Sequence, residues 1–177
     1  MKRKTASFTG TRPIFTGSPS IVQGGFNLDV ANQAFAVGDV IPAGTLAIRD
    51  EAKRTVQIIK TAKVSEVDSE DTTKVSLYVD EFYKPCFAVG DLVLVSGSAA
   101  TAIASVPSIK AIEKKGNAYV ITLSAAIAGL KAGDVLEEVI SDGQTTAKST
   151  ERGKANSVTI CDVEVDEFET SVDVSAD

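Results

Sequence analysis

The sequence predicts an all-β fold of mainly antiparallel short strands, arranged as a barrel or a sandwich, with an extended N-terminal arm and little helix. Two observations carry this prediction. Ala-Val-Gly-Asp followed by an apolar run occurs at 36–41 and again at 88–95, and its core returns as Ala-Gly-Asp-Val-Leu at 132–136. Glycine adopts positive φ without steric cost and aspartate bonds its own backbone, so each copy predicts a turn that leads into a strand. Residues 75–80 alternate apolar and polar side chains, which indicates a half-buried strand.

Residues 1–28 predict an extended arm rather than a regular element. Glycine, proline, serine and threonine dominate this segment, and its apolar residues follow neither a helical nor a strand period. Disordered segments contain few aromatic residues, so we expect the phenylalanines here to be buried against the body or a neighbouring subunit. A frayed terminus is the alternative. The expected interface residues of the arm are Phe8, Phe15, Phe26, Lys2, Arg3 and Lys4.

Residues 29–157 predict a β-rich body built from consecutive antiparallel strands. Pro42-Ala43-Gly44 and the polar segment 50–54 are predicted turns, and strand-like runs flank Gly116-Asn117 as in a hairpin. Residues 158–177 predict a late strand followed by an acidic C-terminal tail. Its valines alternate with acids, which would leave one acidic face at a sheet edge and discourage stray pairing.

The chain contains no histidine, and this disfavours most enzyme chemistry. Histidine is the commonest general base and metal ligand, so we expect no enzyme activity, no cofactor and no metal site. The aspartates of the three Gly-Asp copies, Asp39, Asp91 and Asp134, are candidates for a carboxylate site around a cation, but turn formation explains them more simply. Cys86 and Cys161 lack metal-ligand spacing, and ordinary core positions explain them better than a disulfide.

Charge is concentrated at the two ends of the chain. The net charge is −6, from 18 basic and 24 acidic residues, yet the last twenty residues hold seven acids and no lysine or arginine. The first acid, Asp29, follows four basic residues. Such ends are expected to meet partners or other copies of the chain. A near-neutral body with 6% aromatic residues predicts no nucleic-acid binding, and no apolar run is long enough for a membrane helix.

The order of motifs between about 30 and 140 resembles head fibre and head decoration proteins of tailed bacteriophages, of the type found in phages or prophages of Bacteroidales. The motifs are Gly-Asp-Val-Ile-Pro-Ala-Gly-Thr at 38–45, the charged turn 49–54, Val-Gln-Ile-Ile at 56–59 and Ala-Gly-Asp-Val-Leu at 132–136. The resemblance implies a structural virion protein, made in the host cytoplasm and bound to the major capsid protein on the capsid surface, commonly as a homotrimer. The sequence has no heptad-repeat stalk after the body, so a short decoration subunit fits better than a long fibre.

Two other functions remain open at this point. A carbohydrate-binding or host-adhesion module on a virion or cell surface would bind a surface glycan through exposed aromatics such as Tyr78, Tyr83 and Tyr119. A histidine-free enzyme would require three or more carboxylates that converge in one deep pocket.

Overall fold

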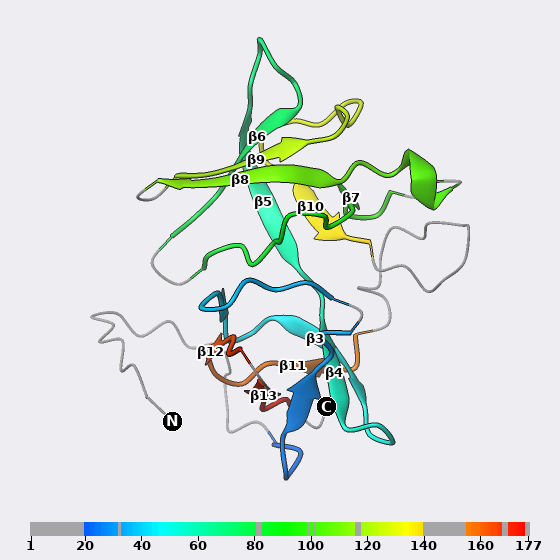
Figure 1. Cartoon of the computed structure of the whole chain (residues 1–177), viewed down its shortest axis with the longest axis vertical. Coiled ribbons are helices and arrows are strands. Elements are labelled where there is room, and N and C mark those ends of the chain that lie inside the picture. Colours follow the sequence, from blue (N-terminus) through cyan, green and yellow to red (C-terminus); the bar gives the residue numbers. More distant parts are fainter. Residues whose placement is uncertain are drawn as a thin grey trace.

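The chain folds into two β-bodies that are stacked along the long axis of the molecule (Figure 1). The computed structural model describes residues 20–31, 33–80, 83–98, 100, 102–115, 118–139, 155–167 and 170–175. Within these residues the regular elements are strands and one short 3₁₀ turn, η1 (Ile103–Ser105), so the all-β prediction is confirmed. No helix in this described part is long and apolar enough to cross a membrane.

The five-stranded body forms the lower half of Figure 1 and contains both early and late parts of the chain. β1 pairs with β4 in parallel, and the other pairs in this sheet are antiparallel. An antiparallel pair, β2 (Val40–Ile41) with β12 (Val163–Glu164), packs beside the sheet. The order in the sheet is β11 (Ser157–Val158), β3 (Leu46–Asp50), β4 (Thr55–Ile58), β1 (Phe26–Leu28) and β13 (Ser171–Val172).

The six-stranded body forms the upper half and is antiparallel throughout. β8 and β9 form the predicted hairpin, although its loop residues 116–117 lie outside the described residues. The order in the sheet is β7 (Val93–Val95), β10 (Val135–Glu138), β5 (Thr61–Val67), β6 (Lys74–Leu77), β9 (Ala118–Leu123) and β8 (Ile109–Lys115).

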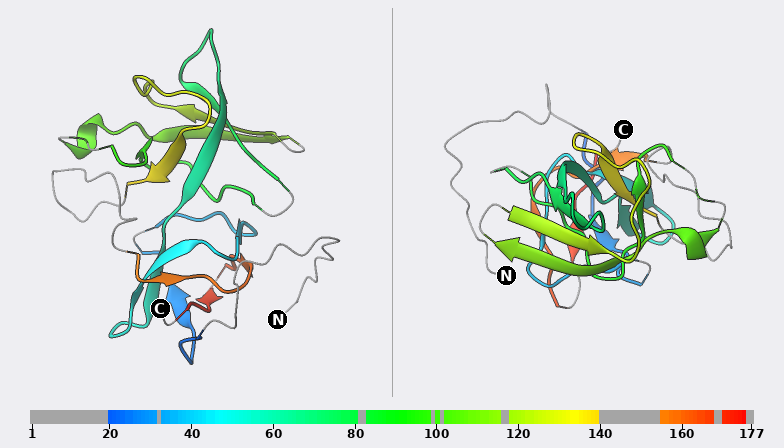
Figure 2. Two further views of the ribbon diagram at one scale, coloured as in Figure 1. Left: turned by 180° about the vertical axis from the view of Figure 1, so that it is seen from behind. Right: turned by 90° about the horizontal axis from the view of Figure 1, so that it is seen from above.

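Both sheets curl until their edge strands meet. An isolated antiparallel bridge, Thr159↔Val174, connects the residues that follow β11 and β13, and another, Leu92↔Ser108, connects the residues that precede β7 and β8. The view from above in Figure 2 shows the strongly twisted strands that this curling requires. Because unpaired edge strands invite pairing with other chains, this closure protects both bodies from edge-to-edge association.

Each body has its own hydrophobic core, and alternation within the strands supplies it. In β6, Val75 and Leu77 are buried while Lys74 is exposed, as the alternating pattern of this stretch predicts. The core of the six-stranded body also contains Phe87, Ile121 and Leu136, whereas the core of the five-stranded body contains Phe26, Ile41, Val56, Ile58 and Val172 among others.

The three Gly-Asp copies form the same turn, as predicted. The backbone N–H groups of Asp39, Asp91 and Asp134 donate to the carbonyl oxygens three residues earlier, at Ala36, Ala88 and Lys131. The glycine before each aspartate has φ between +85° and +102°, which is the left-handed conformation that only glycine adopts freely. Each turn is followed by a strand: β2, β7 and β10 respectively.

The predicted division into an arm at 1–28, a body at 29–157 and a tail at 158–177 needs correction at both boundaries. β1 lies inside the five-stranded sheet, between β4 and β13, so the arm ends before Phe26. At the other end, Val163, Val165, Val172 and Val174 are buried in the same core, so the acidic segment is part of the body as far as it is described. The physical reason is that removal of these valine side chains from water stabilises the folded chain, so they pack in the core instead of extending into solvent.

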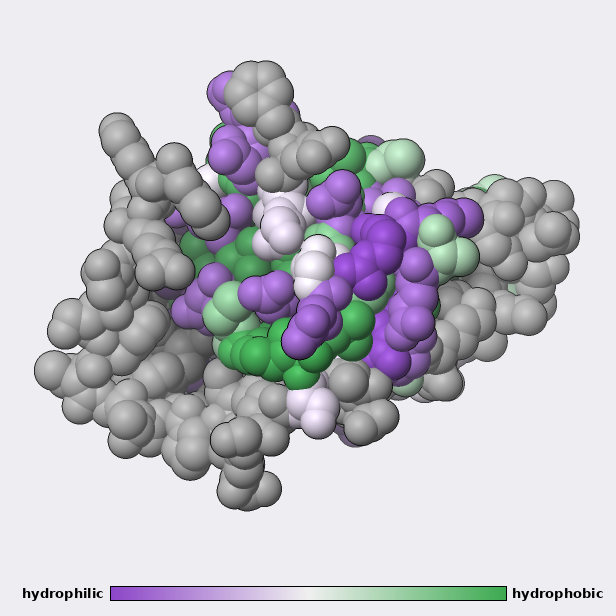
Figure 3. Space-filling view, turned by 90° about the horizontal axis from the view of Figure 1, so that it is seen from below, coloured by the Kyte–Doolittle hydropathy of each residue, from purple (hydrophilic) through white to green (hydrophobic). Residues whose placement is uncertain are grey.

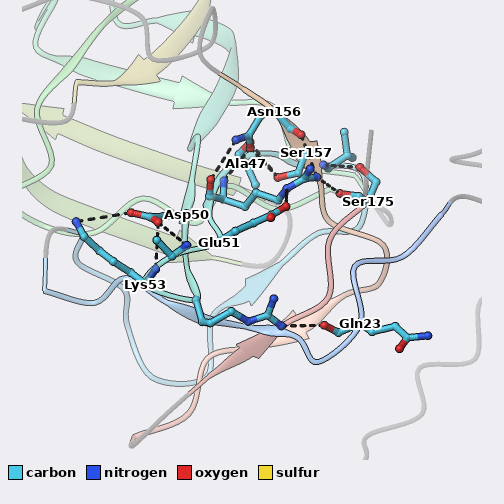
Figure 4. Close-up of polar contacts among 12 residues, drawn as sticks. Gln23, Ala47, Asp50, Glu51, Lys53, Asn156, Ser157 and Ser175 are labelled. Carbon is cyan, nitrogen blue, oxygen red and sulfur yellow. Dashed lines mark hydrogen bonds and ion pairs between the residues drawn. The ribbon is translucent and has the colours of Figure 1, made fainter.

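Polar contacts attach the C-terminal segment to β3. The Arg49 N–H donates to Asn156 Oδ1 at 2.8 Å, and its guanidinium donates to the Ser175 carbonyl oxygen at 2.6 Å. Ser157 Oγ donates to the Ala47 carbonyl oxygen at 3.2 Å. Figure 4 shows Asn156, Ser157 and Ser175 gathered beside Ala47 of β3.

Arg54 closes the β3–β4 hairpin and also clamps the chain that precedes β1. Its φ is +56°, a conformation that side-chain-bearing residues rarely adopt. The guanidinium donates to the carbonyl oxygens of Gln23 and Gly25 at 2.8 and 2.7 Å and lies 4.4 Å from the centre of the Phe26 ring. These contacts hold the backbone in its strained conformation and fix the start of β1.

Replacement of Arg54 by alanine is expected to lower the free energy of unfolding by about 2 kcal/mol. The variant loses two charge-assisted hydrogen bonds and the ring contact but keeps the unfavourable φ. Urea unfolding followed by circular dichroism measures the change. Lys53→Ala is the matched control, because the Lys53 side chain lies next to Arg54 in the same turn and is 77% exposed. Equal stabilities of the two variants would contradict the clamp.

Candidate functional site

A buried ammonium group lies at the junction of the two β-bodies. The Lys60 side chain is 0% exposed, and its Nζ lies 2.7 Å from Asp91 Oδ2 and 3.6 Å from Glu138 Oε1. Nζ also donates a hydrogen bond to the Ala34 carbonyl oxygen and lies 4.4 Å from the centre of the Phe35 ring. These five residues and Gln33 are called the Lys60 cluster below. Three of the four buried charged residues in the described part of the chain belong to this cluster.

The partners of Lys60 come from both bodies. Lys60 stands between β4 and β5, where the chain passes from the five-stranded sheet to the six-stranded sheet. Asp91 belongs to the second Gly-Asp turn, just before β7, and Glu138 is the last residue of β10. The Glu138 N–H donates to the Lys60 carbonyl oxygen at 3.0 Å, so backbone pairing places the two side chains together.

Gln33 connects Glu138 to the five-stranded body. Its side-chain amide donates to the Ile58 carbonyl oxygen at 2.6 Å and accepts from the Ile58 N–H at 2.7 Å, as a neighbouring strand would. The same amide nitrogen also lies 2.9 Å from Glu138 Oε2. One buried amide therefore satisfies the backbone N–H and carbonyl groups of Ile58, the last residue of β4, and also orients the Glu138 carboxylate.

Burial dominates the electrostatics of Glu138. Desolvation raises the pKa of this carboxyl group from its usual range to about 7, and the nearby charge of Asp91 acts in the same direction. The Lys60 ammonium lowers the pKa of Glu138 and so opposes the shift, but this ammonium lies closer to Asp91 than to Glu138. Glu138 is therefore present in both protonation states near neutral pH, which is the range in which a carboxyl group can give and take protons.

Weakly polar groups enclose the cluster on the side of the six-stranded body. Burial raises the pKa of the Cys86 thiol to about 12 and also raises the pKa of the Tyr83 and Tyr119 hydroxyls. The Tyr83 hydroxyl donates to the Thr61 carbonyl oxygen, and the Tyr119 hydroxyl donates to the Phe87 carbonyl oxygen at 3.1 Å.

Neither Cys86 nor Cys161 forms a disulfide; Cys86 is buried and Cys161 is exposed.

The carboxylates of the Gly-Asp turns do not gather around one cation. Asp91 binds Lys60, Asp39 binds Lys114 of β8 at 2.7 Å, and Asp134 accepts from the Lys131 N–H of its own turn. Among the described residues, no group of three or more potential ligands is arranged to hold a metal ion.

The Lys60 cluster can orient an amine against a carboxyl group in a buried site, with a second carboxyl group beside them.

Of the predicted interface residues, Phe26 is the one that the structure describes. It is 1% exposed and packs in the core of its own body, under Arg54, so it is not available to a partner, because the core of its own chain already covers the ring. Phe26 is therefore buried against the body, which is one of the two expected alternatives, and not against a neighbouring subunit. Phe8, Phe15, Lys2, Arg3 and Lys4 lie outside the described residues.

The aromatic residues suggested for glycan binding do not form one surface. Tyr78 is 49% exposed, as its outward position in the strand pattern predicts. Tyr119, in contrast, is buried, and the Lys114 ammonium lies over its ring at 5.4 Å. Tyr83 is partly buried and uses its hydroxyl on a backbone carbonyl group. Of the three tyrosines, Tyr78 is the one whose side chain is exposed and accessible to a glycan.

Sequence reasoning missed Lys60, Glu138 and Gln33 as a functional group. A signal exists for two of them, because Lys60 directly follows Ile58-Ile59 and Glu138 directly precedes Val139. A charged residue that is buried beside apolar residues requires a partner. Gln33 carries no comparable signal, since it belongs to a segment without strand periodicity.

Comparisons with known proteins identify no relative of this chain: no family model, no curated protein and no solved structure matches it.

The raised pKa of Glu138 predicts how stability depends on pH. Its folded-state pKa lies above the unfolded value, so its contribution is fully present below about pH 4.5 and is lost as pH rises through 7. Glu138→Gln is expected to remove this decline, which is on the order of 3 kcal/mol between pH 5 and 8. Urea unfolding at a series of pH values measures it, with the exposed Glu66→Gln as control. Parallel profiles for wild type and Glu138→Gln would refute the burial effect.

Proposed function

We propose that this chain is a structural subunit of a bacteriophage virion, bound to the outside of the capsid as a head fibre or decoration protein. The order of its strand and turn motifs, which resembles such proteins, supports the proposal. The observation that carries it is the distribution of exposed apolar side chains over a body whose sheet edges are closed. A closed body meets partners through side chains and extended segments rather than by adding strands.

The exposed apolar side chains favour the five-stranded body as the attachment surface. In the part of the chain that the structure describes, four of the six large hydrophobic residues that are exposed belong to this body or its connections: Ile21, Val30, Val37 and Val40. Figure 3 shows this body from below, with hydrophobic side chains at the surface between hydrophilic ones. Exposed apolar side chains are one feature of protein–protein contact sites. The six-stranded body then projects away from the capsid.

Charge favours contact between copies in a trimer. Asp162, Glu164 and Asp166 are exposed on the outer side of the segment that contains β12, where no lysine or arginine follows in the sequence. The N-terminal segment has the opposite sign. We infer that the basic segment of one copy binds the acidic face of the next, which would generate a closed ring of identical contacts.

The Gly-Asp repeat provides a matched pair of variants that tests the attachment surface. Val37 and Val89 occupy the same position in two copies of the turn and are 62% and 60% exposed, so aspartate at either site leaves the fold intact. Val37→Asp is expected to lower occupancy on capsids assembled from the major capsid protein by about tenfold or more, because a charge replaces apolar contact. Val89→Asp is expected to bind like wild type.

Two results would contradict the proposal. If wild-type protein does not bind the capsid, the virion function is wrong. If both variants bind equally, the five-stranded body is not the attachment surface. Light scattering on the purified protein gives the number of copies independently, and a monomer at high concentration would contradict the trimer. Binding on a glycan array would instead favour the adhesion function, with Tyr78 as its exposed aromatic residue.

A further inference from the structure

The Lys60 cluster brings an amine and a carboxyl group together under conditions that favour a covalent reaction. Nζ of Lys60 lies 2.7 Å from Asp91 Oδ2, and the two side chains are 0% and 3% exposed. Lys114 and Asp39 form a pair with the same separation, but their side chains are 48% and 14% exposed. Only the first pair is shielded from water and has a second carboxyl group, Glu138, within 4 Å of the amine.

We propose that Lys60 and Asp91 condense to form an intramolecular isopeptide bond, with Glu138 as the catalytic residue that transfers the protons. This inference is independent of the proposed function, because it depends on the interior of the protein and not on any partner.

The reaction balances without an oxidant, a reductant or a co-substrate. Glu138 accepts a proton from the Lys60 ammonium, and the neutral Nζ attacks Cγ of Asp91 to form a C–N bond. The Ala88 N–H donates to Asp91 Oδ2 at 2.8 Å and is positioned to stabilise the negative charge that develops on this oxygen. Glu138 delivers the proton from Lys60 to the other oxygen of Asp91, then accepts a second proton from Nζ of the adduct and delivers it to the same oxygen. The C–O bond breaks, and one water molecule leaves. Both hydrogens of that water originate from Nζ, and Glu138 returns to its starting state.

The surroundings favour the amide over the ion pair. Two opposite charges in a buried site carry a large desolvation cost that their attraction only partly offsets, whereas an amide is neutral. The remaining N–H of the product keeps a hydrogen-bond acceptor, the Ala34 carbonyl oxygen that Nζ already contacts. The Phe35 ring covers the same nitrogen and limits the access of water, which would reverse the reaction.

The reacting groups are held in place before the reaction. Backbone pairing between Glu138 and Lys60 fixes the amine beside the catalytic carboxyl group, and Gln33 fixes the other oxygen of Glu138. The Gly-Asp turn fixes the carboxyl group of Asp91. Such positioning replaces the encounter of two free groups and can supply effective concentrations of about 10⁵–10⁸ M.

Intact-protein mass spectrometry tests the proposal on the wild-type chain, without any variant. The expected mass after incubation at neutral pH is lower than the sequence mass by one water molecule, and digestion is expected to yield a linked pair of peptides that contain Lys60 and Asp91. A wild-type protein that keeps its full sequence mass after prolonged incubation overturns the proposal, and so does a water loss located elsewhere.

Three variants identify the origin of the mass loss. Lys60→Arg and Glu138→Gln are expected to keep their full masses, and Glu138→Gln retains both reacting groups if Lys60→Arg folds poorly. Lys114→Arg is the matched control and is expected to lose one water molecule like wild type. Asp142-Gly143 is a sequence in which cyclisation also releases water. That loss would persist in Lys60→Arg and Glu138→Gln, and its persistence would overturn the isopeptide assignment.

Asp91→Asn gives a second signature of the same reaction. Attack of Lys60 on the amide carbon would release ammonia in place of water, so the mass deficit of this variant is expected to equal one ammonia molecule. An Asp91→Asn protein with a deficit of one water molecule would place the reaction outside the Lys60 cluster and overturn the assignment.

Discussion

Burial of the Lys60 ammonium is the constraint on which the arrangement of the two β-bodies depends. An ammonium group without solvent needs acceptors on every side, and the loss of any one of them leaves an uncompensated charge in the interior. The acceptors come from both bodies: the Ala34 carbonyl oxygen from one, and the carboxylates of Asp91 and Glu138 from the other. Movement of one body relative to the other would separate them, so the contact between Lys60 and Asp91, as an ion pair or as the amide proposed above, couples the two cores.

The buried cluster and the exposed surface have different consequences for function. The proposed isopeptide bond would join groups within one chain and stabilise the arrangement of the bodies. The proposed contacts with partners would instead use exposed turns such as that of Val37 and the acidic face near β12. The proposed virion function would expose the chain to mechanical and chemical stress outside a cell, and a covalent bond at the junction would resist both. Neither role depends on the other, and each has its own experimental outcome.

Local patterns predicted the parts of the fold that depend on local interactions. The Gly-Asp turns, the alternation in β6 and the β8–β9 hairpin are visible in neighbouring residues, and the structure confirms them. The parallel pairing of β1 with β4, and the return of β11 and β13 to the same sheet, join residues that lie far apart in sequence. Such pairings leave no local signature, which is why the boundaries of the arm and the tail were wrong. The Lys60 cluster falls between these cases: charged residues next to apolar ones indicate buried partners, but sequence does not identify the partner.

Cys86 provides the most direct test of coupling between the two bodies, because it is buried beside the Lys60 cluster. In a Cys161→Ser protein, the rate at which a thiol reagent labels Cys86 reports each opening of the junction. The labelling rate, measured across a urea series, should follow global unfolding as measured by circular dichroism, with one common midpoint. Labelling of Cys86 at urea concentrations well below that midpoint, while the strands remain intact, would show that the junction opens by itself and would contradict the account.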